Sequence, residues 1–309
     1  MSSSSRSELF ASLFASLHRV GEPLLLPNAW DVASAVAIAA AGARAVATTS
    51  AGVAWSLGVR DAGSPDAGSP DAGSPDAGSP DAGSQPGPAG PGGLGADRAA
   101  AVIERIAAAV EVPVSADIEA GYGDSPDAVA RTVAAVVRAG AIGVNLEDRR
   151  DAGGLHDLAA QADRIAAARA AAGDTPIWIN ARTDVFLSGA YPVIPDGVAE
   201  ALKRAAGYAE AGADSVFVPG LIDLDAIAEL VAGPLPVAVM AGPGAPSVAE
   251  FASVGVVRVS VGSAIAQAAY GLATRAAAEM LTAGTYDSCA GGVDYAEMNA
   301  RISGQSRTK

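Results

Sequence analysis

Short apolar runs alternate with longer Ala-rich segments along most of the chain. Eight of these runs are apolar throughout instead of alternating with polar residues, which is typical of parallel strands that helices cover on both faces. The predicted strands are residues 24–27, 45–49, 112–117, 143–146, 177–181, 215–218, 236–240 and 256–261.

A helical pattern follows each predicted strand. The predicted helices are residues 31–41, 97–110, 126–139, 158–172, 196–211, 224–231, 246–253 and 264–281, and glycines suited to helix C-caps follow several of them. Eight strand–helix units predict an α/β fold of the (β/α)8 barrel class. A doubly wound open sheet is the alternative, but that fold usually carries a glycine-rich loop after its first strand, and "LLLPNAWDVASA" has none.

The whole chain, residues 1–309, is interpreted as one barrel domain with two additions. Residues 61–93 contain a tandem "DAGSP" repeat with few side chains able to build a core, which predicts a loop insertion. This insertion is interpreted either as a neutral expansion or as a lid, since the loops after strands line the active face of a barrel. Residues 285–309 are predicted to form a helical extension, with a helix near residues 295–302.

The charge balance narrows the possible partners. The net charge is −14 and the pI is about 4.5, which argues against binding nucleic acid or an anionic membrane. An anionic substrate would therefore need a local positive group or a metal. Cys289 is the one cysteine, so no internal disulfide is expected. We recognise neither a signal peptide nor a transmembrane segment, and the expected location is the cytoplasm.

Acidic side chains follow three consecutive predicted strands, beginning with Asp61 after the second, at the end where a barrel carries its active site. Asp117 and Glu119 follow the third strand, Glu147 follows the fourth, and Arg182 follows the fifth. Clustered carboxylates are costly unless a cation lies among them, and oxygen ligands favour Mg²⁺ or Mn²⁺. Arg182 can grip a carboxylate or a phosphonate. Single acids at strand ends are often helix caps, and Asp148 is interpreted as a cap or surface residue.

Five motifs connect the chain with a known superfamily. They are "LPNAWDVASA", "TTSAGVAWSLGVRD", "ADIEAGYGD", "GVNLED" and "INARTD", in that order. Through them the chain resembles the isocitrate lyase / phosphoenolpyruvate mutase superfamily from about residue 24 to about residue 281. The resemblance implies a Mg²⁺-dependent (or Mn²⁺-dependent) barrel that acts on small anionic 2-oxo or 2-hydroxy acids. It also implies a homo-dimer or homo-tetramer, in which the C-terminal part packs on a neighbouring subunit.

The resemblance also implies a role for each matching residue. Asp117 corresponds to the acid that binds the metal directly, and Asp61, Glu119 and Glu147 correspond to acids that hold it through water. Asp61 and Arg182 are the residues expected to take part in catalysis. The residues expected to contact the substrate are Ser50, Ala51, Gly52, Asn180 and Arg182.

The sequence departs from both main branches of the superfamily. The lyase branch carries a cysteine after the fourth strand, whereas this chain reads "EDRRDAGGLHD", which disfavours isocitrate or methylisocitrate cleavage. The mutase branch has a histidine after the sixth strand, where this chain has Pro219. The prediction is a Mg²⁺-dependent lyase that cleaves a C–C bond of a small 2-oxo acid through an enolate, as in oxaloacetate decarboxylation. The alternatives are C–P chemistry, as in phosphonopyruvate hydrolase or phosphoenolpyruvate mutase, and a non-catalytic ligand-binding barrel.

Overall fold

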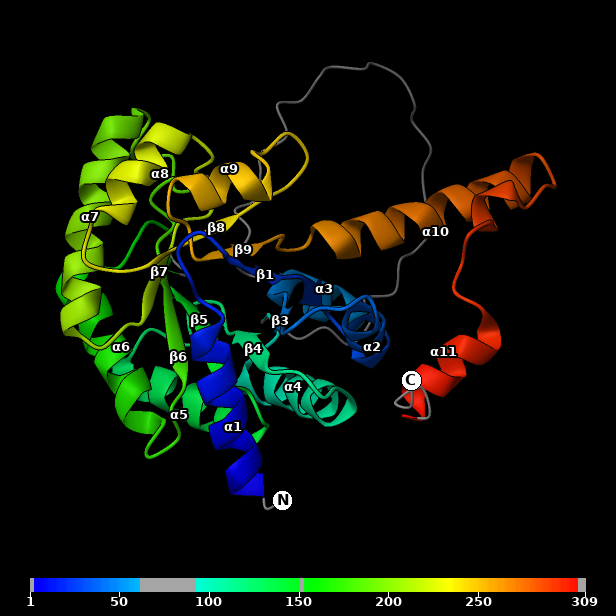
Figure 1. Cartoon of the computed structure of the whole chain (residues 1–309), viewed down its shortest axis with the longest axis horizontal. Coiled ribbons are helices and arrows are strands. Elements are labelled where there is room, and N and C mark those ends of the chain that lie inside the picture. Colours follow the sequence, from blue (N-terminus) through cyan, green and yellow to red (C-terminus); the bar gives the residue numbers. More distant parts are fainter. Residues whose placement is uncertain (1–2, 62–92, 151–152, 305–309) are drawn as a thin grey trace, which may run out of the picture.

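A parallel sheet of nine strands forms the centre of the molecule and confirms the predicted barrel (Figure 1). The structure is a computed structural model that describes residues 3–61, 93–150 and 153–304. The strands are β1 Leu24–Leu26, β2 Asn28–Ala29, β3 Val46–Thr48, β4 Val114–Asp117, β5 Gly143–Glu147, β6 Trp178–Arg182, β7 Ser215–Phe217, β8 Val237–Met240 and β9 Arg258–Ser260. Most of the predicted repeat insertion lies outside the described residues.

The first predicted strand is divided into β1 and β2, and this division closes the sheet. β1 pairs with the last strand, β9, whereas β2 pairs with β3. Pro27 separates the two pieces because it has no N–H to donate, although its carbonyl accepts from the Ala47 amide at 3.1 Å. Asn28 connects both neighbours, donating from Nδ2 to the Thr48 carbonyl (3.0 Å) and accepting the Val261 N–H at Oδ1 (3.1 Å).

Helices surround the barrel at nearly the predicted positions. They are α2 Val32–Ala40, α4 Ala96–Ala109, α5 Pro126–Arg138, α6 Leu158–Ala171, α7 Ile194–Glu210, α8 Leu224–Val231 and α9 Val248–Ser253. α5 begins as its sequence dictates, with Ser125 Oγ accepting from the Ala128 amide (3.2 Å) and proline in the first turn. A short helix, α3 Ser50–Ser56, was not predicted, because its small residues carry little helical periodicity.

The N-terminal helix α1 Ser3–Ser16 packs against one end of the barrel. Phe14 and Leu17 are buried in a cluster with residues of β1, β3 and the start of β5. Just beyond α1, the ring of His18 stacks on Trp178 with centroids 4.0 Å apart. Burial is the main reason that the pKa of His18 falls to about 3, so this imidazole is neutral in the folded protein.

The C-terminal helices form an arm that leaves the barrel (Figure 1). α10 Ala264–Thr282 extends outward, and the chain returns through the short 3-10 turn Asp287–Cys289 to α11 Tyr295–Ile302, which contacts α2. The helix predicted near residues 295–302 is therefore confirmed. The arm exposes large apolar side chains, including Leu281 (82%) and Tyr295 (84%). Within the described residues, the helices fall short of the length and apolar character that crossing a membrane requires.

Candidate active site

The predicted acids meet at the carboxyl ends of three neighbouring strands. β4, β5 and β6 pair in that order, so Asp117 lies beside Asn145, and Glu147 lies beside Arg182. Glu147 is fully buried in the field of several other carboxylates. Burial first, and then the negative charges of Asp184, Asp117 and Glu119, raise its pKa well above the usual range, although Arg182 opposes this rise.

Asp117 is fixed by the backbone around it. Its Oδ2 accepts the Ser50 N–H at 3.1 Å, and its own N–H donates to Thr48 Oγ1 at 2.9 Å. These bonds attach the first residue of α3 and the last residue of β3 to the end of β4. Gly52 completes this junction, since a Cβ there would lie 2.8 Å from side-chain atoms of Trp30 and Thr49. The predicted substrate-contacting segment and the predicted metal ligand therefore form one unit.

A strained turn after β4 holds the second acid. Glu119 and Tyr122 both have positive φ values, +50° and +54°, and residues other than glycine rarely adopt this backbone conformation. Burial is the main cause that raises the pKa of the Tyr122 phenol well above its ordinary value. The charges of Glu119, Asp117 and Asp61 raise it further. Asp61 is therefore near this cluster.

Arg182 is the cation at the mouth of the barrel. Its Nε and Nη2 donate to the two carboxylate oxygens of Asp184 at 2.6 and 2.9 Å, and its Nη1 lies 2.8 Å from Glu147 Oε2. Burial opposes its charge, but Glu147 and Asp184 outweigh burial, so its pKa is raised and it stays charged. The planar guanidinium is thus held in one orientation by two carboxylates.

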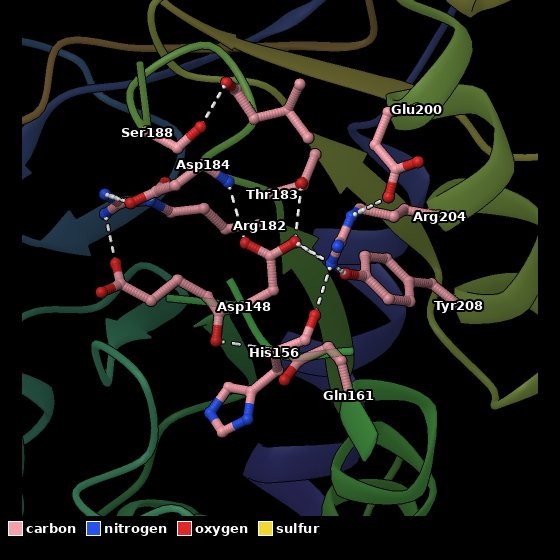
Figure 2. A network of polar contacts seen from close by, with 12 residues as sticks. Asp148, His156, Gln161, Arg182, Thr183, Asp184, Ser188, Glu200, Arg204 and Tyr208 are labelled. Carbon is pink, nitrogen blue, oxygen red and sulfur yellow. Dashed lines mark hydrogen bonds and ion pairs between the residues drawn. The ribbon is translucent and has the colours of Figure 1, made fainter. Parts of the chain in front are cut away.

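Asp148 differs from the sequence interpretation, because it is neither a cap nor a surface residue. It is completely buried beneath Arg182 (Figure 2) and accepts four hydrogen bonds. Its donors are the Asp184 N–H (2.9 Å), Thr183 Oγ1 (2.7 Å), Tyr208 Oη (2.8 Å) and Arg204 Nη1 (3.0 Å). Burial raises its pKa, and these donors oppose the rise. Asp148 therefore fastens the segment that carries Arg182 and Asp184 to helix α7.

A chain of hydrogen bonds runs through the barrel below these acids. Trp178 Nε1 donates to Ser215 Oγ (2.8 Å), which donates to Asn180 Oδ1 (2.5 Å). Asn180 Nδ2 and Arg258 Nη2 both donate to Asn145 Oδ1, at 2.8 and 2.9 Å. Asn180 is completely buried, and each end of its amide has one protein partner.

Arg258 was overlooked in the sequence, although the signal was present. It is a charged residue in the middle of the apolar run "VGVVRVSV", and its side chain is buried in the barrel. By contrast, nothing in the sequence around Asp148 distinguishes a buried acceptor of four hydrogen bonds from a helix cap.

The possible metal ligands around the site are carboxylate oxygen atoms, which suit Mg²⁺ or Mn²⁺. Among the described residues, no three His, Cys, Asp or Glu side chains lie close enough together to hold a metal ion between them. Mg²⁺ usually keeps several water ligands and is bound through one or two carboxylates.

Comparisons with known proteins agree with this geometry. A family model described as phosphoenolpyruvate phosphomutase matches residues 14–68 and 79–281. An uncharacterized protein of Mycobacterium tuberculosis (strain ATCC 25618 / H37Rv) is 35% identical over 291 residues, which cover 94% of this chain and 95% of that protein.

Two solved structures show the same architecture. A lyase/mutase-type protein of Burkholderia cenocepacia J2315 is 35% identical, with a TM-score of 0.78 and coverage of 96% of each chain. A phosphonopyruvate hydrolase, crystallised with oxalate and Mg²⁺, is 21% identical, with a TM-score of 0.74 over 96% of this chain and 95% of its own. At that identity, the second likeness concerns the fold alone.

Proposed function

The chain belongs to the isocitrate lyase / phosphoenolpyruvate mutase superfamily, and we propose that it is a Mg²⁺- or Mn²⁺-dependent lyase that cleaves a C–C bond of a small 2-oxo acid. The observation that carries this proposal is the unit formed by Asp117 and the Ser50 amide beside the held guanidinium of Arg182. It combines a metal ligand, backbone donors and a cation within one barrel mouth.

We assign the metal to the carboxylates on the β4 and β5 ends. Asp117 would hold it directly, and Asp61, Glu119 and Glu147 would hold it through water. The bound metal supplies positive charge beside the oxo oxygen, where negative charge develops as the C–C bond breaks. A structure of phosphonopyruvate hydrolase with oxalate and Mg²⁺ supports the pairing of this fold with a metal and a small dicarboxylate.

The substrate would lie between Arg182 and the start of α3. Arg182 presents a fixed guanidinium that suits a carboxylate. The Ser50 amide already donates to Asp117, and the amides of the next two residues, Ala51 and Gly52, would face the substrate. Asn180, which is expected to contact the substrate, is linked to Asn145 below the site. The protein thereby orients the acid and supplies positive potential where the enolate oxygen forms.

Decarboxylation makes the fewest demands on the residues present. The C–C bond breaks, the carboxyl group leaves as CO₂, and the bonding electrons remain on the enolate, which later takes up a proton from solvent. No acid is needed as the bond breaks, which fits a chain without the cysteine of the lyase branch.

C–P cleavage is the alternative, although the buried Pro219 after β7 replaces the histidine expected for phosphoryl migration. A non-catalytic barrel fits less well, because a ligand-binding role alone does not call for so many buried carboxylates.

We also propose that the protein is a cytoplasmic homo-dimer or homo-tetramer. The arm formed by α10 and α11 exposes Leu272, Leu281 and Tyr286, which together give it an apolar surface suited to a second copy. Light scattering at micromolar concentration tests this assignment, and a strictly monomeric species would contradict it.

A substrate screen tests the activity. Oxaloacetate, its 3-alkyl derivatives and phosphonopyruvate are incubated with the protein and Mg²⁺, with EDTA and Asp117→Ala as controls, and pyruvate, CO₂ and phosphate are measured. CO₂ release that EDTA abolishes supports the proposal. Phosphate release from phosphonopyruvate instead establishes the alternative, and binding of these acids without turnover establishes the non-catalytic barrel.

A further inference from the structure

Helix α6 carries two polar side chains among its buried residues. Gln161 and Arg164 are completely buried, beside the apolar side chains of Ile165 and Ala168. Gln161 Nε2 donates to the Glu147 carbonyl at 3.2 Å, and Gln161 Oε1 accepts from Arg164 Nε at 2.8 Å. Burying a guanidinium is costly unless its donors are paired, so a helix that only packed against the barrel would favour an apolar residue there.

The two terminal nitrogens of Arg164 both reach the turn that connects β4 with α5. Nη1 donates to the carbonyls of Gly123 (2.8 Å) and Asp124 (2.6 Å), and Nη2 donates to the carbonyl of Ala120. These acceptors span residues 120–124. One planar guanidinium therefore holds both ends of the turn at once, which the single ammonium group of a lysine cannot reproduce.

The same turn is strained and carries one of the acids of the proposed site. The positive φ values of Glu119 and Tyr122 are costly, and such a backbone persists only where its surroundings hold it. The Glu119 carbonyl accepts the Glu147 N–H at 3.0 Å, which joins the ends of β4 and β5 directly. Helix α6 joins them a second time, through Gln161 on one side and Arg164 on the other.

We infer that Arg164 is a positioning residue, which holds the turn after β4 in its strained conformation and thereby fixes Glu119 beside Asp117. The Glu119 N–H donates to Asp117 Oδ1 at 3.4 Å, so a shift of the turn moves one acid relative to the other. Arg164 acts through the backbone of the turn and not by contact with metal or substrate. Its hold on the turn is independent of the proposed function, whereas its effect on metal binding rests on that function.

Hydrogen exchange measured by mass spectrometry tests the hold on the turn. Arg164→Lys keeps the charge but loses the planar fork. Peptides that cover residues 118–125 should therefore exchange at least about tenfold faster than in wild type, the equivalent of one lost hydrogen bond to a charged group. Peptides from β7 and β8 should exchange at the wild-type rate. Arg164→Met, which removes every donor, should increase the exchange further, and Arg164→Lys decides the test if Arg164→Met does not fold.

Arg169→Lys is the matched control, because Arg169 lies on the same helix and also donates to backbone carbonyls. Its Nη1 donates to Ile177 (2.7 Å) and its Nη2 to Gly212 (2.8 Å), at the opposite end of the barrel from the acids. Exchange of residues 118–125 should stay at the wild-type rate in this variant. Equal exchange of that segment in Arg164→Lys and Arg169→Lys would overturn the inference.

Mn²⁺ binding, followed by the electron paramagnetic resonance signal of the free ion, tests the consequence for the site. Replacing a residue that orients the ligands of a metal typically weakens binding about 10–100-fold, and we expect a loss in this range for Arg164→Lys and none for Arg169→Lys. Glu119→Gln shows whether Arg164 acts through Glu119. If it does, Arg164→Lys in the Glu119→Gln background binds Mn²⁺ as tightly as Glu119→Gln alone, whereas independent effects would add.

The outcomes separate this inference from the proposed function. Unchanged Mn²⁺ binding by Arg164→Lys, beside a wild type that binds the ion, would overturn the positioning role. An additive loss in the double variant would overturn the action through Glu119. Faster exchange of the turn in Arg164→Lys, together with a wild type that binds no Mn²⁺, would support the hold of Arg164 on the turn and overturn the metal-dependent function instead.

Discussion

Asp148→Ala should be among the most destabilising single substitutions in the described part of the chain. The carboxylate accepts four hydrogen bonds, including one from the buried Arg204 guanidinium, and it is fully inaccessible to water. The alanine variant would leave Thr183 Oγ1 and the Asp184 N–H without their acceptor. Arg204 keeps Glu200, at 2.8 Å from its Nε, and the His156 carbonyl.

The expected loss is about 3–5 kcal/mol of unfolding free energy, the usual cost of removing one partner from a buried charged network. Asp223→Ala is the matched control, because Asp223 accepts one hydrogen bond, from the Ala226 amide at 2.9 Å, as the N-cap of α8. Its loss should cost about 1 kcal/mol.

Urea denaturation followed by circular dichroism gives both values under the same conditions. If Asp148→Ala costs no more than Asp223→Ala, the hydrogen bonds drawn around Asp148 in Figure 2 do not stabilise the fold as argued. Turnover measured below the melting temperature gives an independent reading. The segment that carries Arg182 should loosen, so KM for the substrate should rise more than kcat falls.

Three further predictions concern Asp117, Arg182 and His18. Asp117→Ala should abolish Mg²⁺ binding in calorimetry, because the one carboxylate assigned as a direct ligand is lost; binding as tight as wild type would show that the metal lies elsewhere. Arg182→Lys keeps the charge but loses the planar contact with Asp184, so KM should rise about tenfold while Mg²⁺ affinity stays constant, and a constant KM would refute the substrate role. His18 has its pKa depressed to about 3, so its contribution to stability is complete above its unfolded pKa of 6.5 and is lost as the pH falls toward 3. His18→Phe should keep the stack on Trp178. It should reduce the slope of the unfolding free energy against pH between pH 6 and 4 by up to about 1.4 kcal/mol per pH unit. An unchanged slope would count against a buried neutral imidazole.

The features that could be predicted from the sequence are those that depend on local pattern. Apolar runs and helical periodicity placed the strands and most helices within a few residues, and eight such units favoured a barrel over a doubly wound sheet. The same logic placed Asp117, Glu147 and Arg182 together, because carboxyl ends of adjacent parallel strands meet at one edge. Family motifs then supplied roles that periodicity could not.

The features that escaped prediction depend on which side chains meet across the barrel. Asp148 and its donors on α7 are far apart in sequence, and no local pattern marks their contact. The contact of Arg258 with Asn145 likewise follows only from the register of β9 and the reach of the arginine side chain. The division of the first strand follows from the missing N–H of Pro27, which the sequence contained but which the prediction treated as a strand end.

The divided first strand also sets the order of events during synthesis. The hydrogen bond between Asn28 and Val261 joins residues 233 positions apart, and β1 has β9 as its partner. At about 5–20 residues per second, the N-terminal strand leaves the ribosome roughly 10–50 s before the strand that completes its pairing. During that interval β1 lacks its partner strand and presents an open edge to other nascent chains. The barrel can therefore close only after most of the chain has emerged, and the first strand waits for its partner until then.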